Sequence, residues 1–472
     1  MVPGERATAA GALARVLPVR RGGNSTRRLR LLLGILGILS TLAYLSIAVR
    51  LRVHPVFLRW GFPQGDFLPF FLLHYVPLFL LVLAGAWWTF RIGVDDAGTL
   101  GLILGFGMLF RFLLLPTPPV LSSDIYRYIW DARMQASGVS PYLATPADHP
   151  PANPQQDPIY QQQNRPFART IYPPLAQLAF RASRALGGES TMAMKGLMVL
   201  SDLLTLLLLV QLLQGLSLPR SRVILYAWHP LTVFEVAGSG HVDALAIPFI
   251  LLALVAWRRD RNVTAGVCLG AATLIKIYPI LLLPALFSRR RWPMLLGCGA
   301  VIFLGYLPFL PEAGLGVLGH FPRFLTDPDE MFNPPILGLA VLLFSPVSSS
   351  PIAWASWMAR GALLVILLWL LRRTPDPKAD PLGGIWVIAI AVTLLTPTLH
   401  PWYLLWLLPF LAIQPRPAWI YLSGAISLSY LFYLVPPPMR ALIGVVEYLP
   451  FILLLFLSWG RRPTAEEVNI GP

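Results

Sequence analysis

Residues 122–174 read SSDIYRYIWDARMQASGVSPYLATPADHPPANPQQDPIYQQQNRPFARTIYPP and form the one long polar interval among successive apolar runs. The interval opens with an acid, Asp124, directly after a hydrophobic segment, and it closes on Tyr-Pro-Pro where the apolar pattern resumes. Irregular backbone at membrane depth is tolerated only where it is buried in protein or lines a watery cavity. This contrast predicts a membrane protein that works through the polar loop.

The composition of the chain supports this class. Of the 472 residues, 56% are hydrophobic and only 12% are charged, and the mean hydropathy is +0.65. A soluble domain of this size needs more charge to cover its surface, so we predict an all-α, polytopic integral membrane protein. The net charge of +15 arises from short basic clusters between apolar segments, as the positive-inside rule requires, and we expect no nucleic-acid partner. Cys268 and Cys298 lie in apolar segments, which argues against disulfides and thiolate metal sites.

The apolar runs predict about 11–14 transmembrane helices in a single domain that spans residues 29–460. The tails, residues 1–28 and 461–472, are expected in the cytoplasm. Two loops are expected on the outer side: residues 117–190, which include amphipathic helices, and residues 311–334.

Basic clusters support this topology after residue 190, because each of them falls on the inner side. The agreement requires that the short run Ile336–Phe344 is a re-entrant or interfacial piece rather than a span. Before residue 190 the charge rule is violated once, by the arginines of the predicted outer loop Arg50–Asp66.

The same topology places three polar turns on the outer face beside Asp124. Each turn is the tip of a helical hairpin whose arms are shorter than the roughly 20 residues of a full span. Tips at or below the interface are tolerated where they line protein or a watery cavity. We therefore predict one outer cavity bordered by the long loop and by the tips Gly238–His241, Lys276–Pro279 and Leu399–Tyr403.

Two interpretations of Asp124 remain open. It can be the N-cap of the helix that follows, with Arg127 and Asp131 forming a solvated pair at helical spacing. It can also be a general base that faces a cavity and accepts the proton of a hydroxyl group. Asp131 is the alternative acid, and on a helix it would face a different direction. Tyr126, Arg127, Asp131 and Tyr172 are further candidates for substrate contacts.

Two cations are candidates for a phosphate site. Arg111 lies inside an apolar segment, and Lys276 lies at a hairpin tip interrupted by proline. Cations within the membrane are expensive and are often functional, although Arg111 can also snorkel to the interface. A phosphate group would explain both side chains. The guanidinium of Arg111 could donate two parallel hydrogen bonds to it, and Lys276 could supply a compact positive charge.

The remaining candidates are polar and aromatic residues at two tips. His400, Trp402 and Tyr403 can be ordinary interface residues, but a flat aromatic beside a polar pocket also suits a sugar ring. His241 and Asp243 form an H-x-D pair that resembles a fragment of a metal site. Two ligands without a third are weak evidence, so we count both residues as substrate contacts and expect no metal.

Several motifs for activated substrates are missing. The sequence contains no Walker A motif, no G-x-S-x-G elbow and no Rossmann fingerprint in a strand–helix context. The chain has no soluble domain with a D-x-D motif, so the sequence gives no indication of a nucleotide-sugar site. We therefore expect an activated substrate to arrive from the membrane.

Several motifs together resemble those of bacterial polyprenol-phosphate-mannose-dependent mannosyltransferases, which belong to the GT-C superfamily and include α-1,6-mannosyltransferases of glycosyltransferase family 87. They cover roughly residues 100–415 in the expected order, with Ala132 standing where many relatives have glycine. The motifs are D-I-Y-R-Y-I-W-D-A-R, G-V-S-P-Y, T-I-Y-P-P-L-A-Q-L-A-F, W-H-P-L-T-V-F-E-V-A-G-S-G-H-V-D-A-L, I-K-I-Y-P-I-L-L-L-P and H-P-W-Y-L-L-W-L-L-P.

The resemblance implies transfer of a sugar from a polyprenyl-phosphate donor with inversion at the anomeric carbon. It implies that Asp124 is the catalytic base, and it maps donor-phosphate contacts onto Arg111, Lys276 and His400. We expect a hexosyltransferase with mannose as the transferred sugar and a glycolipid or polysaccharide as the acceptor. The reaction is expected at the outer face of the bacterial plasma membrane, without a cofactor. The alternatives are a transporter or flippase of lipid-linked sugars, and a glycan polymerase or ligase that uses pyrophosphate-linked donors.

Overall fold

The computed structural model describes residues 23–53, 58–59, 62–63, 67–287, 291–324, 330–372 and 381–459. The predicted C-terminal tail and most of the predicted N-terminal tail lie outside the described residues. The chain is an all-α, polytopic membrane protein, as its composition predicts. Its described strands are β1 (Leu58–Arg59) and β2 (Phe62–Pro63), which pair antiparallel.

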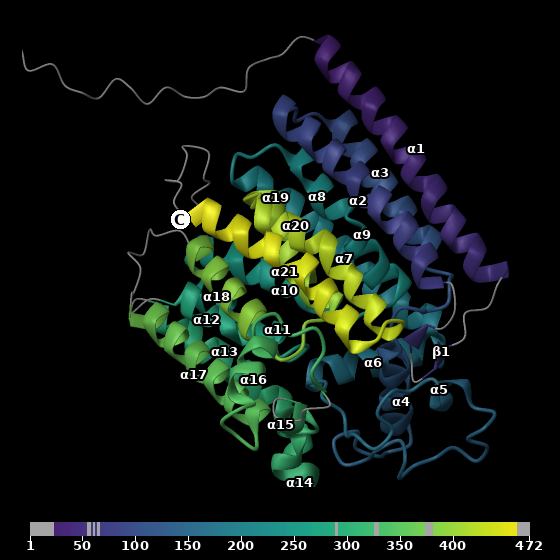
Figure 1. The fold of residues 1–472 in the computed structure, drawn as a ribbon, viewed down its shortest axis with the longest axis vertical. Helices are drawn as coiled ribbons and strands as arrows, with labels where there is room; N and C mark the ends of the chain where they lie inside the picture. Colours follow the sequence, from purple (N-terminus) through teal and green to yellow (C-terminus); the bar gives the residue numbers. More distant parts are fainter. Residues whose placement is uncertain are drawn as a thin grey trace, which may run out of the picture.

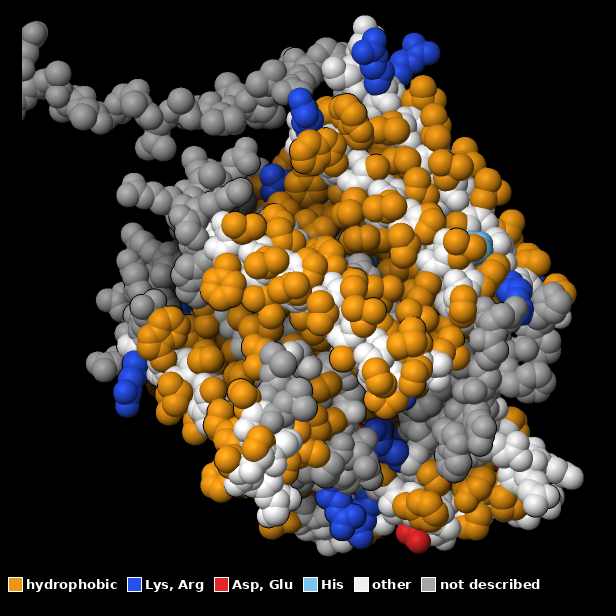
Figure 2. Space-filling model, viewed as in Figure 1, with side chains coloured by type: hydrophobic (Ala, Val, Ile, Leu, Met, Phe, Trp, Pro, Cys, Tyr) orange, Lys and Arg blue, Asp and Glu red, His pale blue; other side chains and the backbone are white. Residues whose placement is uncertain are grey.

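Seven helical stretches in the described part of the chain are long and apolar enough to cross a membrane. Large apolar side chains are exposed along them, and Figure 2 shows these covering one face, with Lys and Arg gathered toward its upper and lower ends. Such a surface suits lipid rather than water. Six of the stretches are α1 (Gly23–Val53), α2 (Phe67–Ile92), α3 (Ala97–Leu114), α7 (Thr191–Gly215), α17 (Pro351–Arg372) and α21 (Pro437–Trp459).

The seventh stretch combines one longer helix with short helical pieces at its C-terminal end. These are α13 (Trp292–Tyr306), η5 (Leu307–Phe309), α14 (Leu310–Ala313), η6 (Gly314–Leu318) and α15 (Phe321–Phe324). The predicted re-entrant run is the eight-residue helix α16 (Leu337–Phe344), which is too short to span a bilayer.

The middle of the chain is built from short and interrupted helices, as the hairpin tips predict. Helix η2 (Val233–Gly238) is a π-helix, and Gly240 adopts a positive φ of 77° before α10 (Asp243–Arg258) begins. Proline opens or interrupts several pieces, because it lacks the backbone N–H that continues a helix. The other pieces are η1 (Arg220–Val223), α8 (Ile224–Ala227), α9 (Pro230–Thr232), α11 (Asn262–Thr273), η3 (Tyr278–Leu282), α12 (Leu283–Leu286), α18 (Pro381–Leu395), η8 (Pro401–Leu407), α19 (Leu408–Ile413), α20 (Pro417–Ala425) and η9 (Ile426–Tyr433).

The polar interval contains α4 (Asp124–Ala136), α5 (Pro158–Gln161) and α6 (Pro174–Gly187). Helices α4 and α6 pack on each other. In Figure 1, α1, α2 and α3 lie side by side, while α4, α5, α14 and α15 lie at the end of the molecule opposite the start of α1. The two predicted outer loops therefore meet at one end of the protein.

Candidate functional site

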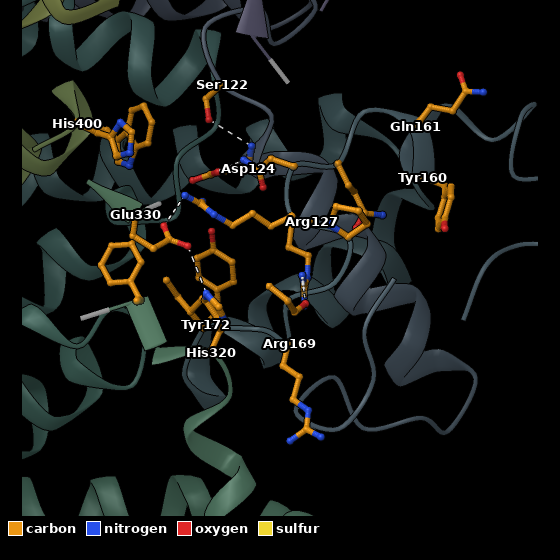
Figure 3. Close-up of a pocket in the computed structure, with 18 of the residues that line it drawn as sticks. Ser122, Asp124, Arg127, Tyr160, Gln161, Arg169, Tyr172, His320, Glu330 and His400 are labelled. Carbon is orange, nitrogen blue, oxygen red and sulfur yellow. Dashed lines mark hydrogen bonds and ion pairs between the residues drawn. The ribbon is translucent and has the colours of Figure 1, made fainter. Parts of the chain in front are cut away.

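A polar cavity of about 620 Å³ lies between the two loops at this end. Figure 3 shows Asp124 near its centre, with His400 and Glu330 on one side and Tyr160 and Gln161 on the other. The residues that line it are Ser122, Asp124, Arg127, Pro154, Gln155, Tyr160, Gln161, Gln163, Asn164, Arg165, Pro166, Ala168, Arg169, Ile171, Tyr172, Lys276, His320, Phe324, Glu330, His400, Trp402 and Tyr403.

Asp124 is the first residue of α4 and is not its N-cap. The N-cap is Ser123, whose side chain makes no capping hydrogen bond, while the backbone N–H of Asp124 donates to Ser122 Oγ at 3.2 Å. The carboxylate accepts a hydrogen bond from Asn164 Nδ2 at 3.2 Å, and its side chain is 20% exposed. This geometry removes the simple capping interpretation and leaves a carboxylate that faces the cavity.

The Asp124 carboxylate is held in its ionised form. Burial raises the pKa of the carboxyl. The nearby His241 and Lys276 and the hydrogen bond from Asn164 lower this pKa by more than burial raises it, so the pKa lies below its ordinary value. The start of a helix adds favourable potential for an anion. Asp124 can therefore accept a proton from a bound hydroxyl group at neutral pH.

The predicted tips meet around this carboxylate in a stack of rings. His241 Nδ1 lies 3.9 Å from Asp124 Oδ2, and the His241 ring stacks on Trp402 with centroids 3.9 Å apart. Trp402 stacks on His400 at 4.3 Å, and His400 stacks on Phe332 at 4.3 Å. Burial lowers the pKa of His400 to about 3, so that His400 is a neutral ring at this wall.

Behind His241 lies a second acid, Glu235, which sequence reasoning missed. His241 Nε2 is 3.3 Å from Glu235 Oε2, and Tyr430 Oη donates to Glu235 Oε1 at 2.7 Å. Both acidic side chains thus border one imidazole, which lies between them. An acid inside an apolar segment is itself a functional signal, and that signal could have identified Glu235.

Of the two cations predicted to bind phosphate, Lys276 is the one that faces the cavity. Its Nζ lies 3.0 Å from Asp243 Oδ2 and 5.2 Å from the centre of the Tyr403 ring. Asp243 therefore pairs with Lys276, whereas His241, the other member of the H-x-D pair, turns toward Glu235 and Asp124. Within the described ranges, no three His, Cys, Asp or Glu side chains are grouped so as to hold a metal ion.

An apolar groove of about 170 Å³ adjoins the cavity. Four residues line both spaces: Ile171, Lys276, Phe324 and Tyr403. The ammonium group of Lys276 therefore lies at the junction of the cavity and the groove. The other residues that line the groove include Ile277, Tyr278, Phe321, Val392, Leu399 and Trp406.

Arg111 has a different environment from Lys276. Its guanidinium is fully buried, forms an ion pair with Asp202, and donates to the carbonyl oxygens of Gly107 and Ala227 at 2.9 and 2.6 Å. Arg111 lines neither the cavity nor the groove. Arg111, which was predicted to bind a phosphate group, thus lies between α3, α7 and α8, where its contacts hold the three helices together.

Of the remaining residues predicted to contact the substrate, some line the cavity and others lie in the protein behind it. Arg127 and Tyr172 line the cavity, whereas Asp131 does not. Asp131 accepts hydrogen bonds from Arg127 Nε at 2.7 Å, from Thr170 at 2.6 Å and from Gln177 at 2.8 Å. Tyr126 is partly buried against the apolar core and does not line the cavity. Asp131 thus ties the loop to α4, and only Asp124 of the two acids faces the open space.

Glu330 of the second loop was also missed. It forms an ion pair with Arg165 of the first loop, and its Oε1 lies 3.3 Å from His320 Nε2. The backbone N–H of His320 donates to Thr170 O at 3.0 Å. These contacts join the two loops across the cavity. No local pattern marks such pairs, because the partners are far apart in the chain.

Comparison with known families matches both halves of the chain. The family model described as alpha-(1->6)-mannopyranosyltransferase, N-terminal domain, matches residues 29–289, more than half of the sequence. The model described as MptB C-terminal domain matches residues 336–458. Comparison with curated proteins and with solved structures gives no match. The first region contains Asp124, His241 and Lys276, and the second contains His400. The chain therefore belongs to the alpha-(1->6)-mannopyranosyltransferase family, and it is a membrane glycosyltransferase.

Proposed function

We propose that this protein is an inverting enzyme that transfers mannose from a polyprenyl-phosphate donor to a hydroxyl of a glycolipid or polysaccharide. One observation carries the proposal: a polar cavity that contains an ionised acid adjoins an apolar groove, and Lys276 lies at the junction. A lipid-phosphate sugar has matching parts in the same order. Its chain suits the groove, its phosphate suits the lysine and its sugar suits the cavity.

In the proposed reaction, the acceptor oxygen attacks the anomeric carbon while its proton passes to Asp124. The new C1–O bond forms as the bond from C1 to the phosphate oxygen breaks. The electron pair of that bond leaves with the polyprenyl phosphate, and the configuration at C1 inverts. Lys276 would stabilise the charge that develops on the leaving phosphate.

The ring stack supports a sugar at the same place. Neutral His400 and Trp402 line one wall of the cavity, where the neighbouring rings of the stack hold both of them in place. We propose that they bound the mannosyl ring next to the phosphate. Lys276 then supplies positive charge on the phosphate side and Asp124 supplies negative charge on the hydroxyl side, as the charge changes of the reaction require.

We further propose that the reaction takes place at the outer face of the bacterial plasma membrane, with both termini in the cytoplasm. The positive-inside pattern of the basic clusters supports this orientation. A polyprenyl phosphate is a good leaving group, so we propose that no metal or other cofactor is required.

The test uses purified protein with polyprenyl-phosphate mannose labelled in the sugar and a synthetic octyl α-mannoside acceptor. We expect Asp124→Asn to reduce kcat by at least about 100-fold, because general base catalysis contributes on this scale. Donor binding should remain, because the amide keeps the shape of the side chain.

The matched control is Asp148→Asn, which changes an exposed acid of the same loop outside the cavity. Turnover of this variant should equal that of the wild type. Full turnover by Asp124→Asn would exclude Asp124 as the base, and absence of mannose transfer by the wild type would exclude the proposed donor.

A further inference from the structure

The cavity extends well beyond the space next to Lys276. Figure 3 shows Tyr160 and Gln161 on the side of Asp124 away from His400. In an inverting displacement, the incoming hydroxyl and the leaving phosphate lie on opposite faces of the anomeric carbon. If the donor occupies the end formed by Lys276 and His400, the acceptor approaches Asp124 from the end formed by Tyr160.

Gln163 supplies the clearest sign of a ligand at this end. Its side chain lines the cavity and is only 7% exposed. Within the described part of the chain, neither its Oε1 nor its Nε2 has a hydrogen-bond partner. Buried amides are nearly always hydrogen-bonded, and an unpaired one requires an explanation. A bound ligand with hydroxyl groups would satisfy both atoms.

The wall around Gln163 is held firmly in place. Asp157 caps α5 by accepting from the backbone N–H groups of Ile159 and Tyr160 at 2.9 and 3.0 Å. Arg133 of α4 donates to Asp157 at 2.6 Å. The Gln163 N–H donates to Tyr160 O at 3.4 Å. The side chains therefore face the cavity from a rigid turn, as a preorganised site requires.

The neighbouring residue connects this wall to the base. Asn164 Nδ2 donates to Asp124 Oδ1 at 3.2 Å. A group bound at Gln163 is thus one residue along the chain from Asn164, which contacts the Asp124 carboxylate.

The chemistry of the wall indicates the class of ligand. Arg127 and Arg165 are paired with Asp131 and Glu330, so their charges are balanced within the protein. Arg169 points away from Asp124 in Figure 3. The polar side chains that remain at the end formed by Tyr160 are carboxamides and the tyrosine ring. Carboxamides can hydrogen-bond the hydroxyl groups of a sugar, and the tyrosine ring can pack on the face of a sugar ring.

We propose that Gln163, Tyr160 and Asn164 form an acceptor subsite for a neutral saccharide chain. Gln163 binds a sugar residue next to the one whose hydroxyl attacks. This inference rests on the proposed function, because it assumes that the donor occupies the end at Lys276. It goes further by naming the residues that select an acceptor of more than one sugar.

The experiment compares octyl α-mannoside with the α-1,6-linked octyl dimannoside and trimannoside as acceptors. In the wild type, KM should fall as the acceptor lengthens. Gln163→Ala should raise the KM of the trimannoside about tenfold, which corresponds to loss of one or two hydrogen bonds. The KM of the monosaccharide acceptor and the KM of the donor should stay within about twofold of the wild type.

Gln156→Ala is the matched control, because Gln156 is an exposed glutamine of the same loop that does not line the cavity. Its KM values should equal those of the wild type. Tyr160→Ala is the second variant, and because Tyr160 is partly exposed, this change does not depend on refilling a buried site. It should also reduce the preference for the trimannoside.

Binding of a fluorescent trimannoside without donor separates this inference from the proposed function. Weaker binding to both variants than to the wild type supports the subsite, whether or not the wild type transfers mannose. Unchanged trimannoside binding and KM in Gln163→Ala and Tyr160→Ala would overturn it. An equal rise in the donor KM would also overturn it, because the wall would then contact the donor.

Discussion

Asp124 stays ionised in a largely buried setting because basic side chains lie close to it. Burial raises the pKa of this carboxyl, and the charge of His241 is the largest contribution that lowers it again. The position of His241 is set in turn by Glu235 at 3.3 Å and by the Trp402 ring at 3.9 Å. The base therefore depends on a residue that need not touch the substrate.

This dependence predicts the effect of His241→Gln on the pH profile. The substitution removes the charge that lowers the pKa of Asp124, so the pKa rises toward or above its ordinary value. Asp124 must be ionised to accept a proton, so activity should be lost at a higher pH on the acid side than in the wild type. The measurement is kcat against pH with saturating donor and acceptor.

His149→Gln is the control for this profile, because His149 is an exposed histidine of the same loop that lines no part of the cavity. Its acid limb should coincide with that of the wild type. An unshifted acid limb in His241→Gln, together with a normal kcat at neutral pH, would show that His241 does not control the base.

At the scale of elements, two cations with similar sequence contexts have different roles. Arg111 joins α3 to α7 through Asp202 and to α8 through the carbonyl of Ala227. Lys276 follows α11 and faces both the cavity and the groove. One cation contributes to the packing of helices, and the other is placed to meet a ligand.

The two variants Arg111→Ala and Lys276→Ala should therefore differ. Arg111→Ala leaves Asp202 charged and buried without its partner, which costs about 3–5 kcal/mol of stability. We expect a clearly lower Tm in detergent for this variant. Lys276→Ala also leaves buried Asp243 without its partner, so its Tm should fall as well. Only Lys276→Ala should in addition raise the donor KM at least about tenfold, because a charge-assisted contact to phosphate is lost.

Thermal unfolding and donor titration of both proteins decide this comparison. A stable Arg111→Ala protein with a raised donor KM would place Arg111 at the phosphate after all. An unchanged donor KM in Lys276→Ala would remove the proposed phosphate contact.

At the scale of the whole molecule, the two loops close one end of a helical body whose sides are apolar. Figure 1 places α4, α5 and α14 at the end away from the start of α1, and Figure 2 shows the apolar face between basic groups at the two ends. The start of α1 and the cavity should therefore lie on opposite sides of the bilayer.

Cysteine labelling tests this orientation, starting from a variant in which Cys268 and Cys298, the two cysteines of the chain, are replaced by alanine. Phe167→Cys introduces a thiol at a site that is 82% exposed in the polar loop. A membrane-impermeant maleimide should label it in intact cells. Asn24→Cys, at the exposed start of α1, should be labelled only after the cells are permeabilised. The reverse pattern would invert the proposed topology.

By itself, the sequence determined the class of protein, the breaks in its helices and the loop that contains Asp124. These features depend on local properties, namely hydropathy, proline and the length of apolar runs. Only the tertiary structure decided that Lys276 rather than Arg111 faces the cavity. It also brought Glu235 to His241, and Glu330 to Arg165. The physical reason is that an ion pair between distant segments depends on how the helices pack, and a local pattern of residues does not encode its partner.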